Sequence, residues 1–141
     1  MAYRLGCELA DRIAAVGAVA GTIITTDCRP ARPVSIIDIH GTADKLYPYE
    51  GEPVNGLTYP STPANLERWR LLDGCAGPVQ TTSAVLVTVH SYSGCRNGTA
   101  LTSYVITGGG HDWTSGADPA GVDATQVVWE FFAAHPKTAG Q

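Results

Sequence analysis

Two kinds of hydrophobic pattern alternate along the 141-residue chain. Apolar positions at helical spacing predict helices over 2–12, 62–74 and 123–136. Apolar runs predict strands over 14–20, 33–41, 84–92 and 100–107. The first of these runs is unbroken and the second is nearly continuous, which is typical of strands buried on both faces of a parallel sheet. Because the strands are interleaved with helices, the sequence predicts an α/β layered fold.

Capping residues mark the ends of the second and third helices. We expect Thr62 to cap one helix and Asp123 to cap the other, and Pro136 to end the last one. The first helical pattern starts directly after Met1 and has no Ser, Asp or Asn before it to satisfy the first amides. From this we expect that further protein precedes Met1 in the parent. Two tryptophans on helices, Trp69 and Trp129, are expected in the core.

The composition argues against a nucleic-acid-binding protein and against a membrane-spanning one. Hydrophobic residues make up 44% of the chain and charged residues 16%, which is typical of a globular protein. The net charge is −4 and no basic run occurs, so nucleic acid is not expected as a partner. The apolar stretch at 13–24 is too short to span a membrane. Glu8 and Asp11 before it argue against a signal peptide.

The cysteines and histidines carry no metal-binding spacing. The four cysteines are Cys7, Cys28, Cys75 and Cys95, and no two of them form a CxxC pair. Their even number predicts two disulfides and an exported protein, with three pairings open. Four free thiols in a cytosolic protein are the alternative. The four histidines also lack metal-ligand spacing, so no metal and no cofactor is expected.

A carboxylate and an imidazole follow two of the predicted strands. Asp44 comes shortly after the strand at 33–41, and His111 follows the strand at 100–107 after three glycines. In an open α/β sheet the carboxyl ends of strands meet at one edge, so these side chains are expected to meet there. An Asp that accepts a hydrogen bond from a His forms two thirds of a Ser-His-Asp hydrolase site. Alternatively, Asp44 is only a turn residue.

Three further residues are candidates for substrate binding. They are His40 at the end of its strand, Tyr47 in the loop after Asp44, and Trp113 just after His111. Each has a structural alternative: a hydrogen-bonded histidine near the site for His40, a loop anchor for Tyr47, and packing for Trp113. The glycines before His111 are expected to give its imidazole room to move.

An ordered set of motifs gives the chain a family resemblance. HGTAD, YPYEG, W…DGC, GGGHDW and WEFFAAHP follow one another between Met1 and about Pro136. This order resembles the esterase family of polyhydroxybutyrate depolymerases and of feruloyl and acetylxylan esterases, which are secreted α/β-hydrolases. The resemblance implies that Asp44 is the triad acid and His111 the triad base. It also implies that residues 1–141 are the C-terminal part of one α/β-hydrolase domain, with a mostly parallel sheet whose N-terminal strands are missing.

The resemblance places the nucleophile outside this sequence. In the family, a segment like MAYRLGCELADRIAAV follows the G-x-S-x-G-G elbow, and none of the seven serines here lies on such an elbow. We therefore expect the nucleophilic serine before Met1, and no hydrolysis by this chain alone. The implied substrate is an ester, polymer-linked in plant polysaccharide or polyhydroxyalkanoate, and the implied location is extracellular, with the signal peptide outside this fragment. Alternatives are a non-catalytic module and part of a serine peptidase of the same fold.

Overall fold

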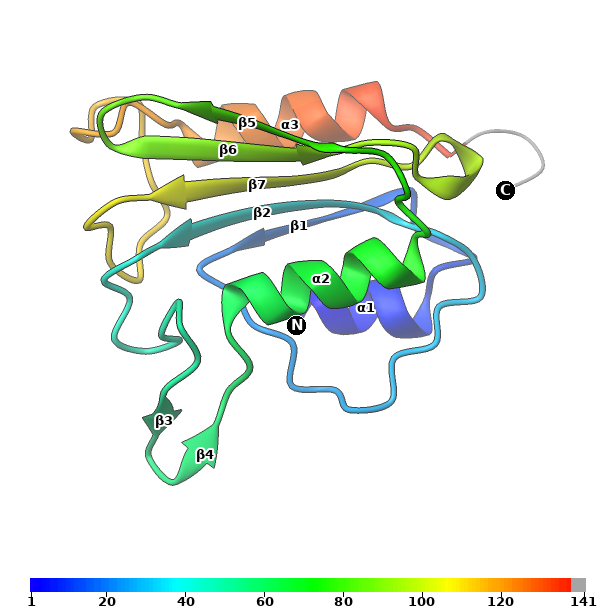
Figure 1. Ribbon diagram of the computed structural model, residues 1–141, viewed down its shortest axis with the longest axis horizontal. Helices are drawn as coiled ribbons and strands as arrows, with labels where there is room; N and C mark the ends of the chain where they lie inside the picture. Colours follow the sequence, from blue (N-terminus) through cyan, green and yellow to red (C-terminus); the bar gives the residue numbers. More distant parts are fainter. Residues whose placement is uncertain (138–141) are drawn as a thin grey trace.

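Five strands form one mixed sheet in the computed structural model, which describes residues 1–137 (Figure 1). Their order across the sheet is β1 (Ala15–Val19), β2 (Ser35–Gly41), β7 (Leu101–Ile106), β6 (Val87–Tyr92) and β5 (Val79–Ser83). The first three are parallel to one another, whereas β6 and β5 are antiparallel to their neighbours. The predicted α/β class is confirmed. The last four positions of the expected domain, 138–141, lie outside the described residues.

Helices cover both faces of this sheet (Figure 1). They are α1 (Ala2–Glu8), α2 (Thr62–Leu72) and α3 (Ala124–Ala134). Adjacent residues of β1 show the two sides, because side chains alternate along a strand. Val16 lies near Gly6 of α1, while Val128 and Phe132 of α3 contact Gly17. The helices α1 and α2 therefore share one face and α3 covers the other.

The helix ends differ in part from the prediction. Asp123 caps α3 as expected, since its carboxylate accepts a hydrogen bond from the Gln126 amide at 3.0 Å. The cap of α2 is Ser61, whose hydroxyl accepts from the Ala64 amide, and not Thr62. Thr62 is the first helical residue and its hydroxyl has a different partner, described below. The first helix ends at Glu8, four residues before the predicted end.

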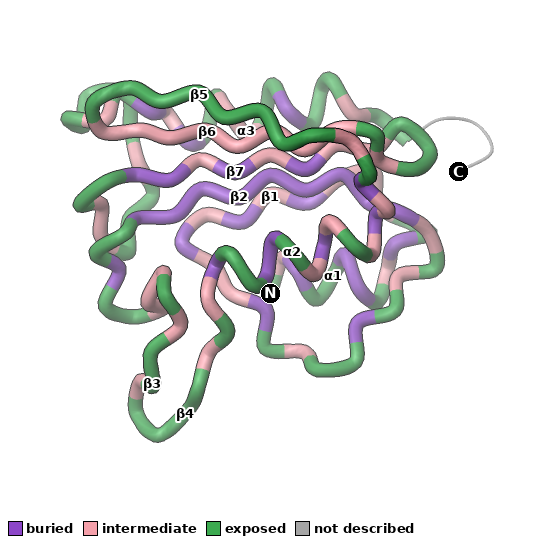
Figure 2. The backbone as a smooth tube through the Cα atoms, viewed as in Figure 1, coloured by how far each residue is buried: buried purple, intermediate pink, exposed green. Residues whose placement is uncertain are grey.

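The core lies around the central strands (Figure 2). Every residue of β2 is buried, and Trp69 of α2 is fully buried between the sheet and α1. The expectation for Trp129 was wrong, because 71% of its surface is exposed on the outer side of α3. In the same helix, Val128 and Phe132 contact the sheet at Gly17, whereas the side chain of Trp129 faces outward.

Short or polar strands escaped the sequence patterns. Strand β5 is exposed along its whole length and has the sequence VQTTS, so it carries no hydrophobic signal. A small hairpin of β3 (Pro53–Val54) and β4 (Leu57–Thr58) lies between the predicted strand at 33–41 and the predicted helix at 62–74. A 3-10 turn, η1 (Arg96–Gly98), precedes β7. Peripheral strands of this kind are defined by their neighbours in the sheet rather than by their own residues.

Two disulfides join the helices α1 and α2 to loops of the sheet. Cys7 pairs with Cys28 and Cys75 with Cys95, which resolves the three pairings left open by the sequence. The first ties α1 to the loop after β1, and the second ties the end of α2 to the loop before β7. Within residues 1–137, no helix combines the length and the apolar character needed to cross a bilayer.

Candidate active site

The two central parallel strands bring Asp44 and His111 to one edge of the sheet. Strands β2 and β7 are paired from Ile36 opposite Leu101 to Gly41 opposite Ile106. Because the strands are parallel and in this register, their carboxyl ends lie side by side. The loops that follow them therefore begin as neighbours, and each carries one of the two predicted residues.

Asp44 and His111 are joined by a hydrogen bond. The Nδ1 atom of His111 lies 2.9 Å from Oδ2 of Asp44 and donates to it. The other oxygen, Oδ1, accepts from the backbone amides of Leu46 and Tyr47 at 2.8 and 2.9 Å. These amide bonds close an Asx turn, a structure in which an Asp side chain bonds the backbone that follows it. Asp44 is thus both a turn residue and the partner of His111.

This environment keeps the carboxylate of Asp44 ionised. Burial is the largest single influence and by itself raises the pKa of Asp44. The hydrogen bonds from the Tyr47 amide, from His111 and from the Leu46 amide outweigh it, so the pKa lies below its ordinary value of 3.8. A charged acceptor with two amide donors is well suited to orient an imidazole and to stabilise its protonated form.

The imidazole of His111 is open on its other side. Its side chain is 38% exposed, and its Nε2 has no hydrogen-bond partner among residues 1–137. No serine of this part of the chain is bonded to it, and all four cysteines are held in disulfides. The arrangement is an acid–base pair whose second ring nitrogen can exchange a proton with a group from outside.

The glycines near His111 allow close backbone contact, whereas the sequence suggested that they give the imidazole room to move. Gly108 has a φ of +73°, a left-handed conformation that favours glycine in a turn. Gly109 packs directly on the end of β2: its carbonyl oxygen accepts from the Ala43 amide at 2.8 Å. A Cβ on Gly41 would lie 2.2 Å from that oxygen. Glycine at these positions lets the two loops touch through their backbones, which fixes the distance between Asp44 and His111.

His40 lies behind the pair and not at its surface. Only 1% of it is exposed, which does not allow the direct substrate contact expected from the sequence. Its Nε2 is 2.8 Å from the Tyr47 carbonyl oxygen and 3.3 Å from Oδ2 of Asp44. Its Nδ1 is 3.2 Å from the hydroxyl of Thr62. Sequence analysis missed Thr62 as a site residue, because its position at a helix start indicated only a cap.

Tyr47 and Trp113 flank the pair on different sides. The Tyr47 ring meets the His111 ring edge to face, with the centroids 5.5 Å apart, and also packs on Tyr59 at 5.1 Å. Trp113 is 62% exposed, and its indole N–H donates to the hydroxyl of Thr125 at the start of α3. Tyr47 therefore borders the imidazole directly, whereas Trp113 is anchored toward α3.

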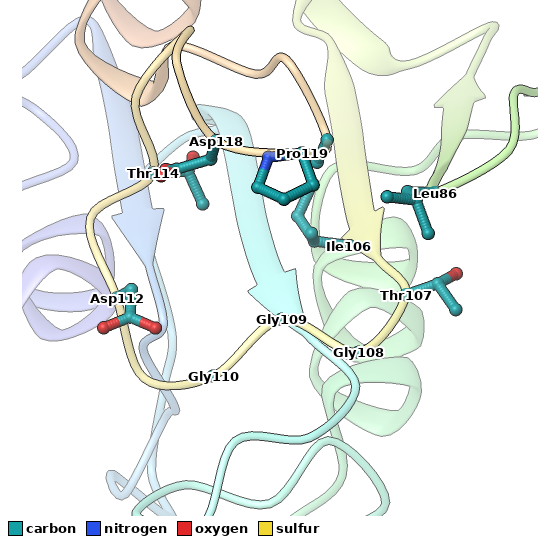
Figure 3. Close-up of a pocket in the computed structure, with 11 residues that line it drawn as sticks. Leu86, Ile106, Thr107, Gly108, Gly109, Gly110, Asp112, Thr114, Asp118 and Pro119 are labelled. Atoms are coloured by element: carbon teal, nitrogen blue, oxygen red, sulfur yellow. The ribbon is translucent and has the colours of Figure 1, made fainter.

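A cavity of about 260 Å³ lies beside the glycine loop (Figure 3). Figure 3 shows the backbone of residues 108–110 along one side and Thr114, Asp118 and Pro119 across from it, with Ile106 beside the proline ring. Asp112 adds a second carboxylate, and none of the lining residues is basic. Neither Asp44 nor His111 lines this cavity. Within the described residues, no three His, Cys, Asp or Glu side chains are grouped so as to hold a metal ion.

Comparisons with known proteins point to esterases. No protein-family model matches the chain. The chain is 33% identical over 122 residues to feruloyl esterase B of Piromyces equi. The match covers 79% of this chain and 22% of that protein. The chain is 30% identical over 143 residues to feruloyl esterase C of Emericella nidulans. That match covers 95% of this chain and 46% of the relative. A putative esterase, NocK of Nocardia uniformis subsp. tsuyamanensis, is 28% identical over 139 residues. That match covers 84% of this chain and 40% of the relative. The chain spans less than half of the length of these relatives.

Proposed function

We propose, from the relationship of this chain to feruloyl esterases, that its parent protein hydrolyses carboxylic esters with a Ser-His-Asp triad. Asp44 is the triad acid and His111 the triad base. The observation that carries the proposal is the 2.9 Å hydrogen bond from His111 Nδ1 to the buried carboxylate of Asp44, together with the open Nε2. This is the geometry that an acyl-transfer site requires of its acid–base pair.

In this mechanism His111 moves one proton twice. As the serine hydroxyl attacks the ester carbonyl, Nε2 takes its proton and the imidazole becomes charged. The carboxylate of Asp44 stabilises that charge through Nδ1–H and remains ionised. The proton then goes to the leaving alcohol, and the acyl group stays on the serine. Water attacks this acyl group, His111 takes the proton of the water and returns it to the serine oxygen, and the acid is released. The reaction needs no cofactor.

The serine comes from a strand that pairs with the open edge of β1. Such a strand, parallel to β1, would have its carboxyl end at the edge of the sheet where Asp44 and His111 lie. Figure 1 shows that α1 runs back antiparallel to β1, as a helix that follows a strand-to-helix elbow does. We therefore place the nucleophile directly before Met1 in an α/β-hydrolase domain of which residues 1–141 are the C-terminal part. Residues 1–141 alone are expected not to hydrolyse esters.

The substrate class follows from the relatives and from the cavity beside the glycine loop. The relatives named feruloyl esterases favour aromatic acyl groups, and polymer-linked acetyl or hydroxyalkanoate esters are the other candidates. The cavity holds two carboxylates and no basic residue, which suits a neutral group with several hydroxyls, such as one sugar ring. Two disulfides in 141 residues favour secretion into an oxidising compartment.

The test is ester hydrolysis by the parent protein with single substitutions at the pair. His111→Ala and Asp44→Asn should each lower kcat for methyl ferulate by about 10³-fold or more. His90→Ala is the matched control, because that histidine lies on β6 and its side chain bonds to Thr81, away from Asp44. It should leave kcat within about twofold. Retention of most of the activity by His111→Ala would remove this histidine from the mechanism.

A further inference from the structure

We infer that His40 is a positioning residue for Asp44, and that the hydroxyl of Thr62 supports the ring tautomer that makes this possible. The inference rests on the proposed function for its catalytic consequence, although its structural part can be tested without it. Three observations carry it: the burial of His40, its contacts with both ends of the Asp44 turn, and the hydroxyl on its second nitrogen.

His40 reaches the Asp44 turn at two points. Its Nε2 lies 2.8 Å from the Tyr47 carbonyl oxygen and 3.3 Å from Asp44 Oδ2. The amide of Tyr47 in turn donates to Asp44 Oδ1. The N–H on Nε2 therefore bonds to the last residue of the turn and lies next to the carboxylate oxygen that also holds His111. Loss of this N–H would free the turn and, with it, the carboxylate.

Only one neutral tautomer fits these contacts. The carbonyl and the carboxylate near Nε2 are both acceptors, so Nε2 must carry the proton. The Nδ1 atom then has a lone pair, and the hydroxyl of Thr62 donates to it across 3.2 Å. A hydroxyl can make this bond because its hydrogen rotates about the Cβ–O bond. The acceptor at Nε2 thus sets the tautomer of His40, and the Thr62 hydroxyl satisfies the other ring nitrogen.

Thr62 is well placed for this role. It is 2% exposed, and its backbone amide donates to the Tyr49 carbonyl oxygen at 2.8 Å. The first residue of α2 is therefore tied to the loop after Asp44 by its backbone and to His40 by its side chain. Pro63 follows it in the helix, which fixes the entry of the chain. Movement of α2 would be transmitted to Asp44 through these contacts.

The first test uses nitrogen-15 NMR of the whole 141-residue chain. In the wild type we expect His40 to show a protonated Nε2 and an unprotonated Nδ1, and His111 to show a slowly exchanging Nδ1–H. Thr62→Val removes the hydroxyl at nearly constant volume. It should shift the His40 Nδ1 resonance, because this nitrogen loses its hydrogen-bond donor, and broaden the His111 Nδ1–H signal through exchange with water. Thr62→Ser should restore both signals.

A second histidine–threonine pair gives a matched control. The hydroxyl of Thr81 lies 3.0 Å from Nδ1 of His90 on the exposed strands β5 and β6. Thr81→Val should leave the His40 and His111 signals unchanged. If Thr62→Val does not fold, His40→Gln serves instead, since its amide N–H can still reach the turn. That variant should keep the His111 signal, whereas His40→Leu should lose it.

The second test uses the parent esterase. Thr62→Val should lower kcat about tenfold at nearly unchanged KM, because the substrate still binds while Asp44 is misplaced. Thr62→Ser should regain most of kcat. Unchanged His40 and His111 signals in Thr62→Val, or a doubly protonated His40 in the wild type, would overturn the inference. If the signals change as expected but the parent hydrolyses no ester, the proposed function fails and the positioning role stands.

Discussion

Substitution of Gly41 by alanine tests whether backbone contact between two loops holds the acid–base pair together. The added Cβ would lie 2.2 Å from the Gly109 carbonyl oxygen and 2.6 Å from that of Gly110. Both obstacles are backbone atoms, so no side chain can rotate away. Restoring an ordinary contact requires the glycine loop to retreat by about 1 Å. The hydrogen bond from Ala43 to Gly109 would then break, and His111 would move away from Asp44.

The expected magnitude has two parts. Overpacking of this kind destabilises a fold by about 1–3 kcal/mol, which urea denaturation of the 141-residue chain measures. A displacement of about 1 Å at a catalytic pair lowers kcat by about 100-fold, which ester hydrolysis by the parent protein measures. The loss of activity should exceed what the stability change explains, because the wild-type fold would still predominate at 25 °C.

Gly116→Ala is the matched control for this experiment. A Cβ at Gly116 would have its nearest neighbour 3.8 Å away, at the Asp123 Cβ, so it adds a methyl group without a clash. Its stability and activity should stay close to those of the wild type. If Gly41→Ala behaves in the same way as Gly116→Ala in both assays, the close approach of the two loops does not fix the site.

Three further predictions concern the rest of the fold. Burial raises the pKa of Asp73 from 3.8 to about 7, so its folded state binds a proton that the unfolded state releases. The free energy of unfolding therefore falls as the pH rises from about 4 to about 7. Asp73→Asn should remove up to roughly 4 kcal/mol of that fall, as measured by urea denaturation at each pH. Replacing Cys7 and Cys28 together by serine opens a loop of 21 residues and should cost roughly 3 kcal/mol, whereas an unchanged denaturation midpoint would show that the disulfide contributes nothing. Trp69→Ala should cost about 3–5 kcal/mol and Trp129→Ala under about 0.5 kcal/mol, and equal losses would contradict their burial.

The central part of the fold could be predicted because its residues carry strong local signals. Strand β2 is buried on both faces, and its nearly continuous apolar run indicated this directly. The proximity of Asp44 and His111 followed from a general rule about strand ends, not from any property of the two residues. Strand β5 could not be found, since an exposed edge strand needs neither apolar nor alternating residues.

Most members of the candidate site were predictable, with the exception of Thr62, but their contacts were not. His40 and Tyr47 were expected to contact substrate, yet His40 lies behind the carboxylate and Tyr47 contributes its backbone as well as its ring. The contact between Gly41 and Gly109 joins residues 68 positions apart in the sequence, by the difference of their numbers. Such roles depend on long-range contacts, and a pattern of residue types along one chain contains no information about them.

The pairing of β2 with β7 divides the site into a constant and a variable part. Asp44 and His111 follow two adjacent strands whose pairing involves neither the β3–β4 hairpin nor the loop around Pro119. Under the proposed function, changes of length or composition in those peripheral loops can therefore alter what the parent protein binds without moving the strand ends that carry the acid and the base. The parent protein is then a suitable starting point for exchanging substrate preference by loop grafting.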